Sequence, residues 1–176
     1  MNKEEYFLLQ KISEGQLSAM EVLYIRYAPQ VKSFACAILK NEDDAEDIVQ
    51  DVFLLIWDKR KQCLQADNFK SYLFTMTRNL IYNKLKRRKN HDKFVDMSEF
   101  KPQTNNPEER IETKDILEHI RTEVSQMTEQ QKVIYFLSRH EELTYKEIAE
   151  VLQISPKTVQ YHIGNILSRL KEIKTM

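Results

Sequence analysis

The sequence contains little glycine and proline. Among 176 residues there are two glycines and four prolines, whereas a typical glycine share of roughly 7% would give about 12. Phosphate-cradling loops and dinucleotide fingerprints need glycines at fixed spacing, because backbone amides must approach the phosphate without an intervening Cβ. Many-stranded sandwiches and barrels need turn residues at each hairpin. The scarcity excludes these nucleotide-binding motifs and predicts long helices with few joints.

Metal-ligating patterns and long apolar runs are also missing. Cys36 and Cys63 have no closely spaced cysteine partner, and the four histidines never pair at ligand spacing. The longest uninterrupted apolar run, residues 52–57, is far shorter than the roughly 20 residues that span a bilayer. The N-terminus has no apolar signal region. We therefore expect a cytoplasmic protein with no metal and no cofactor, in which both cysteines are ordinary buried or half-buried residues.

The two signs of charge are separated along the chain. The formal charge is zero, with 27 basic and 27 acidic residues, but residues 41–58 hold seven acids and no base, and residues 59–93 hold 11 bases and two acids. Such a dense basic block is typical of a surface for a nucleic-acid backbone. The acidic block would be repelled by nucleic acid and should face water or a basic partner. Two solvated helix faces explain the pattern equally well.

Apolar residues at helical spacing predict an all-α protein. A first helix over residues 3–14 ends at Gly15, a residue that readily takes the left-handed conformation of a helix C-terminus. Ser18 begins the second helix as an N-cap. We expect Pro29 to kink or divide this helix. Asn41 caps the third helix, in which the apolar positions follow one face and the acidic residues the other.

A fourth helix is predicted over residues 69–88, after a loop over residues 59–68. One of its faces is apolar and belongs to the core. Another face carries aromatic and hydrogen-bonding side chains at steps of three and four residues, and it leads into a basic run. Such a face can stack on bases and hydrogen-bond to them. Its residues are Tyr72, Thr75, Asn79, Tyr82 and Lys86, followed by Arg87 and Arg88.

A break in periodicity divides the chain into two helical domains. Residues 91–106 lack a helical pattern, and we interpret them as an interdomain linker between domains over residues 1–90 and 107–176. Asn106 as N-cap and Pro107 at the first helical position predict a helix that runs to about residue 126. The fold class is therefore all-α, with two small helical domains joined by a linker.

The C-terminal domain contains a predicted helix-turn-helix. The segment LTYKEIAEVLQISPKTVQYHIGNILSRLK, from Leu143, indicates a short helix begun by Thr144, a three-residue turn and a longer helix begun by Ser155. Gln153 stands where many such turns have glycine, so it must tolerate the backbone angle of the turn. Two helices of an ordinary bundle are the alternative. Exposed side chains of the second helix are able to contact base edges and phosphates in a major groove: Lys157, Thr158, Gln160, Tyr161, His162, Asn165 and Arg169.

Two segments together resemble a known family. DAEDIVQDVFLLIW (residues 44–57) with FKSYLFTMTRNLIYNKLKRR (residues 69–88) resembles the second conserved region of extracytoplasmic-function (ECF) sigma factors, the smallest members of the bacterial primary-sigma superfamily. LTYKEIAEVLQISPKTVQYHI (residues 143–163) is similar to their fourth region. The fourth-region segment alone would also suit response-regulator output domains. The resemblance to sigma factors therefore depends on the second-region segments, residues 44–57 and 69–88. The resemblance covers nearly the whole chain.

The resemblance implies a role for each surface. The acidic helix would dock on core RNA polymerase through Asp47, Gln50, Asp51 and Leu54. The loop over residues 59–68 would help to hold a flipped base, and the second helix of the helix-turn-helix would read the minus-thirty-five element as a duplex. Thr75 and Met76 stand where primary sigma factors have two tryptophans for melting, so melting should be weaker. The minus-ten element would be recognised by Tyr72, Thr75, Arg78, Asn79, Tyr82, Lys86, Arg87 and Arg88.

The partners implied by the resemblance are core RNA polymerase, promoter DNA and an anti-sigma factor, which in this family is often membrane-anchored. No small-molecule substrate is expected, and the free protein should be a monomer. One competing hypothesis is a transcription regulator that binds DNA through its helix-turn-helix without polymerase. Another is a magnesium-dependent enzyme acting on nucleic acid, although its candidate ligands lie along a single helix: Asp43, Asp44, Glu46, Asp47 and Asp51.

Overall fold

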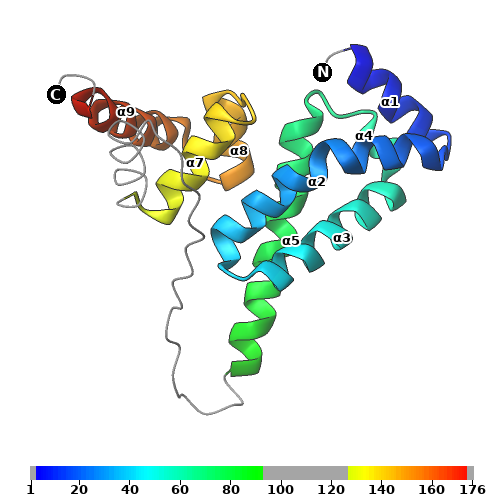
Figure 1. Cartoon of the computed structure of the whole chain (residues 1–176), viewed down its shortest axis with the longest axis horizontal. Helices are drawn as coiled ribbons and strands as arrows, with labels where there is room; N and C mark the ends of the chain where they lie inside the picture. The colour runs from blue at the N-terminus through cyan, green and yellow to red at the C-terminus, as the bar shows by residue number, and fades with distance from the viewer. Residues whose placement is uncertain (1–2, 93–126, 174–176) are drawn as a thin grey trace, which may run out of the picture.

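The N-terminal part of the protein is a bundle in which α2 packs against both α3 and α5 (Figure 1). The computed structural model describes residues 3–92 and 127–173. At one end of the bundle, α1 contacts α2 and the short helix α4. The helices of this bundle are α1 (Lys3–Ser13), α2 (Leu17–Leu39), α3 (Glu42–Asp58), α4 (Arg60–Cys63) and α5 (Phe69–Asp92).

Three further helices form a second bundle, beside α2 and α5 (Figure 1). They are α7 (Glu129–Arg139), α8 (Tyr145–Leu152) and α9 (Pro156–Ile173). A short turn joins α8 to α9, and α7 packs against both of them. The described residues contain helices and no strand. The expected all-α class, with two helical parts and a helix-turn-helix in the second, is confirmed.

The core of the first bundle is built from the predicted apolar faces. In α3, Ile48, Val52 and Ile56 recur at four-residue steps and are at most 1% exposed. Phe34 of α2 and Leu73 of α5 are fully buried in the same core cluster. Burying one side chain of this size stabilises the fold by about 1.5–3 kcal/mol. The packing of α2, α3 and α5 therefore holds the outward faces of α3 and α5 in a fixed relation.

Three of the predicted N-caps are present. The Oδ1 atom of Asn41 accepts a hydrogen bond from the backbone N–H of Asp44 at 2.8 Å. The Oγ atom of Ser155 accepts one from the N–H of Thr158 at 3.0 Å. Thr144 begins α8 with a complete capping box. Because the first N–H groups of a helix have no partner within the helix, these side chains determine where the helices begin.

Three of the described residues end helices in the left-handed conformation, and one of them is Lys40 at the end of α2, with φ 55°. Gly15 has φ +88° and closes α1 as predicted. Gln153 has φ 55° at the end of α8, so the residue in place of the usual glycine adopts the angle that the turn requires. A residue with a Cβ in this conformation costs roughly 1–2 kcal/mol.

Several predicted boundaries and joints are wrong. Ser18 is not the N-cap of α2, because the helix begins at Leu17 with Gln16 at the cap and without a side-chain capping bond. Pro29 does not divide α2, which continues through it. Proline removes the hydrogen bond to the carbonyl four residues earlier, and that residue, Ile25, is 69% exposed, so water can solvate the freed carbonyl.

The expected loop over residues 59–68 contains a helical turn, α4, held by the buried side chain of Cys63. The expected linker began at residue 91, but α5 continues to Asp92. The rest of that linker, and the helix predicted over residues 107–126, lie outside the described residues.

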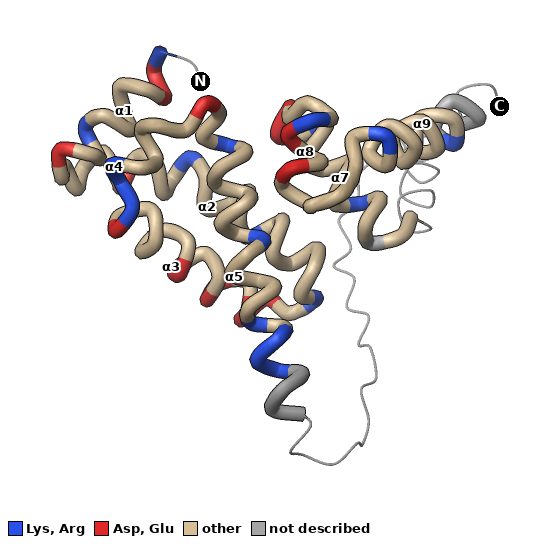
Figure 2. Tube along the Cα trace, turned by 180° about the vertical axis from the view of Figure 1, so that it is seen from behind, with Lys and Arg blue, Asp and Glu red and all other residues tan. Residues whose placement is uncertain are grey.

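A cluster of ion pairs joins α3 to α5. Asp44 is only 7% exposed, and its Oδ1 atom lies 2.9 Å from Nζ of Lys84 and 2.6 Å from a terminal nitrogen of Arg88. The Nζ atom of Lys84 also lies 2.8 Å from Oδ2 of Asp47. The acidic and basic blocks of the sequence therefore partly neutralise each other, where α3 lies beside the basic end of α5 (Figure 2).

We expect Asp44→Asn to weaken this joint in a pH-dependent way. Burial by itself raises the pKa of Asp44, but hydrogen bonds and charges from Lys84 and Arg88 outweigh burial and hold the pKa below its usual value. The stabilisation is therefore present above the unfolded pKa of about 3.9 and is lost as the pH falls through the folded pKa. At neutral pH, Asp44→Asn should lower the free energy of unfolding by about 1.5–3 kcal/mol.

Urea denaturation at neutral pH and at about pH 3 measures this effect. The difference between Asp44→Asn and the natural protein should shrink at the lower pH. The matched control is Asp43→Asn, which removes the same charge at the exposed neighbouring position and should change the unfolding free energy by less than about 0.5 kcal/mol. Equal losses of unfolding free energy in Asp44→Asn and Asp43→Asn would contradict the stabilising role of the ion pairs that Asp44 forms with Lys84 and Arg88.

Candidate functional site

The outward face of α3 is acidic, with an apolar residue at its end. Asp47, Gln50, Asp51 and Leu54 are all exposed and follow one another at helical steps. Leu54 is 69% exposed, which is unusual for a leucine on a helix that otherwise buries its apolar residues. The structure thus places the four residues predicted to dock on a partner along one exposed face of α3.

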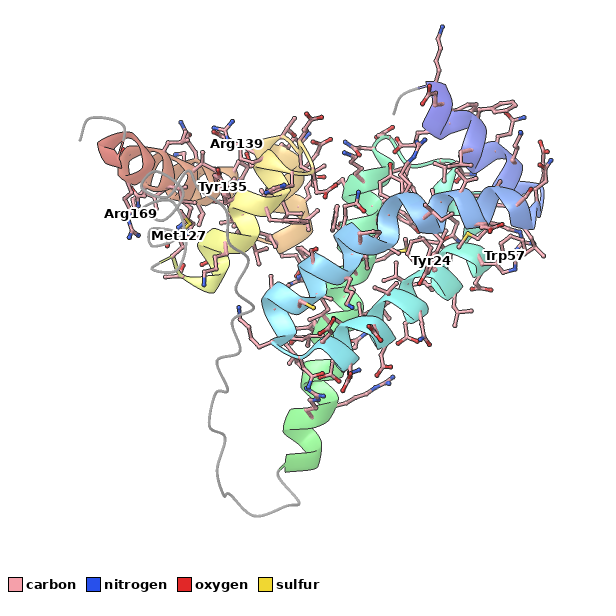
Figure 3. All side chains as sticks on the ribbon, in the orientation of Figure 1. Tyr24, Trp57, Met127, Tyr135, Arg139 and Arg169 are labelled. Atoms are coloured by element: carbon pink, nitrogen blue, oxygen red, sulfur yellow. The ribbon has the colours of Figure 1, made fainter. Side chains whose placement is uncertain are left out.

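Beside this face lies a groove between α2 and α3 that the sequence analysis missed. Tyr24, Ile25, Pro29 and Val49 line the groove together with Gln50. Tyr24 is 45% exposed, and Figure 3 shows it between the two helices. In the sequence, the apolar residues of α2 read as one core stripe. The sequence did contain a signal for this groove, because α2 has more apolar positions than one helix face can bury.

The exposed face of α5 contains a connected group of three side chains. One terminal nitrogen of Arg78 donates a hydrogen bond to Oδ1 of Asn79 at 3.2 Å. The guanidinium carbon of Arg78 lies 5.9 Å from the ring centre of Tyr82, which is 57% exposed. An aromatic ring, a guanidinium group and an amide at one place can stack on an unpaired base and hydrogen-bond to its edge.

The other predicted residues of α5 differ in how available they are. Lys86 and Arg87 are exposed, but Arg88 is paired with Asp44. Tyr72 is half-buried, and burial raises the pKa of its phenol. Thr75 is also half-buried, and its hydroxyl donates to the carbonyl oxygen of Ser71 at 2.8 Å. Asn79, Tyr82, Lys86 and Arg87 are therefore exposed, Arg88 is exposed but paired with Asp44, and Arg78, Tyr72 and Thr75 are half-buried.

The segment between α3 and α5 is anchored to the end of α3 and to the core. The guanidinium of Arg60 lies 5.1 Å from the ring centre of Trp57, and one of its nitrogens donates to the carbonyl oxygen of Trp57 at 2.9 Å. Cys63 is fully buried, and burial raises the pKa of its thiol to about 11. Such a thiol is protonated at neutral pH and unreactive, which fits its expected role as an ordinary buried residue.

The second helix of the helix-turn-helix, α9, presents its predicted contact residues away from the buried stripe. Val159, Ile163 and Ile166 are at most 3% exposed. Lys157, Gln160 and Tyr161 are exposed, whereas the other four predicted contact residues are half-buried: Thr158, His162, Asn165 and Arg169. In Figure 3, Arg169 lies at the far end of α9 from the turn. A helix exposed in this way can enter a major groove with its first turns.

The carboxylates considered for magnesium do not converge. Asp44 and Asp47 are both paired with Lys84, and Asp44 also with Arg88, so basic side chains already occupy these carboxylates, whereas Asp51 is exposed farther along α3. Over residues 3–92 and 127–173, no three histidine, cysteine, aspartate or glutamate side chains are grouped so that they could hold a metal ion. No helix within those ranges is both long and apolar enough to cross a membrane.

Comparison with known proteins identifies both parts of the chain. Residues 23–91 match the family model Sigma-70 region 2, and residues 117–170 match the model Sigma-70, region 4. Together the two segments span well over half of the chain. The first contains α3 and nearly all of α5, and the second contains α7, α8 and most of α9. The exposed faces described above therefore lie within the matched regions.

Relatives and solved structures agree with these matches. The chain is 22% identical to the RNA polymerase sigma factor CarQ of Myxococcus xanthus, over 94% of each chain. It is 23% identical to the ECF RNA polymerase sigma factor SigM of Bacillus subtilis, over 88% of this chain and 94% of SigM. The fold is similar to that of sigma factor RpoE from Bartonella quintana, solved in complex with the anti-sigma factor NepR, with a TM-score of 0.65, 20% identity and coverage of 89% and 96%.

These matches establish the class, a helical transcription initiation factor built from sigma-70 regions 2 and 4. Within that class, the chain belongs to the ECF sigma factors. It is an alternative sigma factor, which directs promoter recognition, and the sigma factor family consists of non-enzymatic transcription initiation factors.

Gly164 provides a test of how α9 is packed at its exposed side. It is exposed inside α9, and a Cβ added there would have no atom within 4 Å. Since glycine within a helix costs about 0.5–1 kcal/mol relative to alanine, we expect Gly164→Ala to raise the free energy of unfolding by that amount. Chemical denaturation of the free protein measures it. If the stability of Gly164→Ala is unchanged or lower, the added methyl group must meet a steric contact at this position, contrary to the open space that the structure shows.

Proposed function

We propose that the N-terminal domain, residues 1–90, binds core RNA polymerase and the minus-ten element, and that the C-terminal domain, residues 107–176, binds the minus-thirty-five element. Residues 91–106 would form the linker between them. The observation that carries this proposal is the presence, on one rigid bundle, of an exposed acidic helix face on α3 and an exposed basic and aromatic face on α5. A protein that must hold a polymerase and DNA at once needs two such faces.

The docking surface would consist of the α3 face and the neighbouring groove. The carboxylates of Asp47 and Asp51 suit a basic helical partner, because complementary charge steers association and fixes the register. Leu54 and Ile25, each 69% exposed, provide apolar contacts beside the charges, as in protein interfaces with an apolar centre and a polar rim. A regulator that acts without polymerase would have no use for this face, so the exposed acids favour the sigma factor.

The minus-ten surface would act on single-stranded DNA. Extruding a base costs a few kcal/mol, and stacking it on an aromatic ring such as that of Tyr82 returns about 1–3 kcal/mol. Met76, at one of the positions where primary sigma factors have tryptophan, is only 6% exposed, so it cannot supply a second stacking surface. We therefore expect weaker melting than by a primary sigma factor, and weak promoter binding by the free protein. Tethering two such modest sites on one polymerase supplies the missing affinity.

The minus-thirty-five surface would act on duplex DNA. Gln160 lies in the first turns of α9 and is exposed, and glutamine pairs well with adenine in the major groove. Lys157 is exposed beside it and can reach the phosphate backbone, which positions the helix without specifying sequence.

We also propose an anti-sigma factor as a partner. RpoE of Bartonella quintana was solved with the anti-sigma factor NepR, and CnrH with the cytosolic domain of CnrY, at TM-scores of 0.65 and 0.60 to this chain. We expect the free protein to be a cytoplasmic monomer without enzymatic activity, cofactor or small-molecule substrate.

The double variant Asp47→Lys with Asp51→Lys tests the docking surface. Juxtaposing like charges at an interface costs several kcal/mol, so capture of core RNA polymerase should fall by at least about 100-fold. Copurification and binding titration with purified core polymerase measure the change. Glu4→Lys with Glu14→Lys is the matched control, since it makes the same change of charge at exposed positions of the N-terminal bundle away from α3. Normal polymerase capture by Asp47→Lys with Asp51→Lys, in folded protein, refutes the docking face.

Asn79→Ala and Gln160→Ala test the division between the two promoter elements. Losing a good contact to a base removes about 1–3 kcal/mol of discrimination between the preferred base and the other bases at that position. Asn79→Ala should therefore relax preference within the minus-ten element only, and Gln160→Ala within the minus-thirty-five element only. Transcription by polymerase with each variant, on a promoter scanned base by base, measures both, so each variant is the control for the other. The assignment is wrong if both variants change the same element.

A further inference from the structure

Lys84 of α5 is shared by two carboxylates of α3. Its Nζ atom lies 2.9 Å from Oδ1 of Asp44 and 2.8 Å from Oδ2 of Asp47. Asp44 is buried in the joint between the two helices, whereas the side chain of Asp47 is 64% exposed and belongs to the proposed docking face. Lys84 therefore connects the joint between α3 and α5 to the surface that is proposed to bind polymerase.

Lys84 is held in this position from inside the bundle. Its side chain is only 23% exposed, and its inner partner, Asp44, is bound by Arg88 as well, through both carboxylate oxygens. Burial by itself lowers the pKa of Lys84, but hydrogen bonds to Asp47 and Asp44 outweigh burial and raise the pKa. The ammonium group is therefore charged at neutral pH and stays beside Asp47 while α3 and α5 are packed together.

A second lysine pairs acids on another flank of α3. The Nζ atom of Lys32, on α2, lies 2.7 Å from Oε1 of Glu42 and 2.8 Å from Oε1 of Glu46. Four of the seven acids between residues 41 and 58 are thus paired within the chain. In the part of the chain that the structure describes, the other three have no basic side chain within 4 Å: Asp43, Asp51 and Asp58.

A basic partner would therefore meet a different situation at each of the two docking carboxylates. Asp51 lies four residues beyond Asp47, about 6 Å farther along the helix, and is exposed with its charge unpaired. At Asp47 the partner has to displace Lys84 or share the carboxylate with it. Exchanging one charged partner for another yields only the difference between the two interactions, so Asp47 adds less to docking than its exposure suggests.

We propose that Lys84 competes with core RNA polymerase for Asp47, so that it weakens docking and leaves Asp51 as the main charged anchor. The inference rests on the proposed docking of α3 on polymerase. Lys84 acts through Asp47 and lies outside the docking face itself. If Lys84 instead oriented Asp47 for the partner, removing the lysine would weaken docking. Competition and orientation therefore predict opposite changes in affinity.

The variant Lys84→Gln tests the competition in the full-length protein. It removes the ammonium group, while Arg88 still pairs with Asp44. The dissociation constant for purified core RNA polymerase, measured without DNA at low salt, should fall about fivefold. The gain should shrink at high salt, because salt screens charges near a surface, whereas the effect of a packing change would persist. The matched control is Lys3→Gln, which removes the same charge at an exposed position of α1 and should leave the dissociation constant close to that of the natural protein.

Asparagine variants of the two docking carboxylates test the same idea with Lys84 in place. Asp51→Asn should weaken polymerase binding about fivefold, and Asp47→Asn less than about twofold, because Lys84 already holds that carboxylate. In the Lys84→Gln protein, Asp47→Asn should weaken binding about as much as Asp51→Asn does, which a double-mutant cycle measures. If Lys84→Gln does not fold, as urea denaturation would show, the comparison of Asp47→Asn with Asp51→Asn decides alone, and equal losses overturn the competition.

The outcomes separate this inference from the proposed function. An unchanged or higher dissociation constant for folded Lys84→Gln, while Asp51→Asn still weakens binding, overturns the competition and leaves the docking face intact. The same conclusion follows if Asp47→Asn costs as much affinity in the natural protein as in the Lys84→Gln protein. If Asp51→Asn binds polymerase normally, the docking face itself is refuted, and the competition for it is refuted as well.

Discussion

The structure depends on α5 packing on two sides at once. One side of the helix enters the core formed with α2 and α3, where Phe69 and Leu73 are fully buried. Another side meets α8, and Phe74 reaches both Phe34 and Phe136. Only the remaining strip of the helix is exposed, and it carries the proposed DNA surface. Because side chains on one helix keep a fixed angular relation, the position of this proposed surface follows from which residues are buried on the other two sides.

Charge acts in two ways on this framework. Near the basic end of α5, Asp44 pairs with Lys84 and Arg88, so part of the charge separated along the sequence is used to join two helices. Farther along α3, Asp51 stays exposed. A carboxylate that is buried and paired contributes mainly to stability, whereas an exposed one is screened by salt and contributes little. The exposed acids are therefore the ones available to a partner.

The contact between the bundles differs from the core of the first bundle in composition. It combines one aromatic edge-to-face pair with a few polar bonds, and the groove beside it is not filled. Interfaces of this kind between parts of one chain normally allow the parts to move relative to each other.

Local features could be predicted from the sequence because their causes are local. The capping residues Asn41, Thr144 and Ser155, the left-handed end at Gly15 and the buried stripe of α3 all follow from neighbours a few residues away. The positions of α2 and α4 were predicted less well, because packing against other helices overrides the local preferences at Ser18, Pro29 and residues 60–63.

The sequence by itself determined the helical class, the helix-turn-helix and the identity of the exposed faces on α3, α5 and α9, since burial follows from periodicity. Only the tertiary structure decided which charges pair, that Tyr24 and Ile25 line a groove beside the acidic face, and that Asn68 and Glu147 meet. Asn68 and Glu147 lie 79 positions apart in the chain. Periodicity and capping rules describe neighbours on one helix, so they contain no information about which helices come into contact.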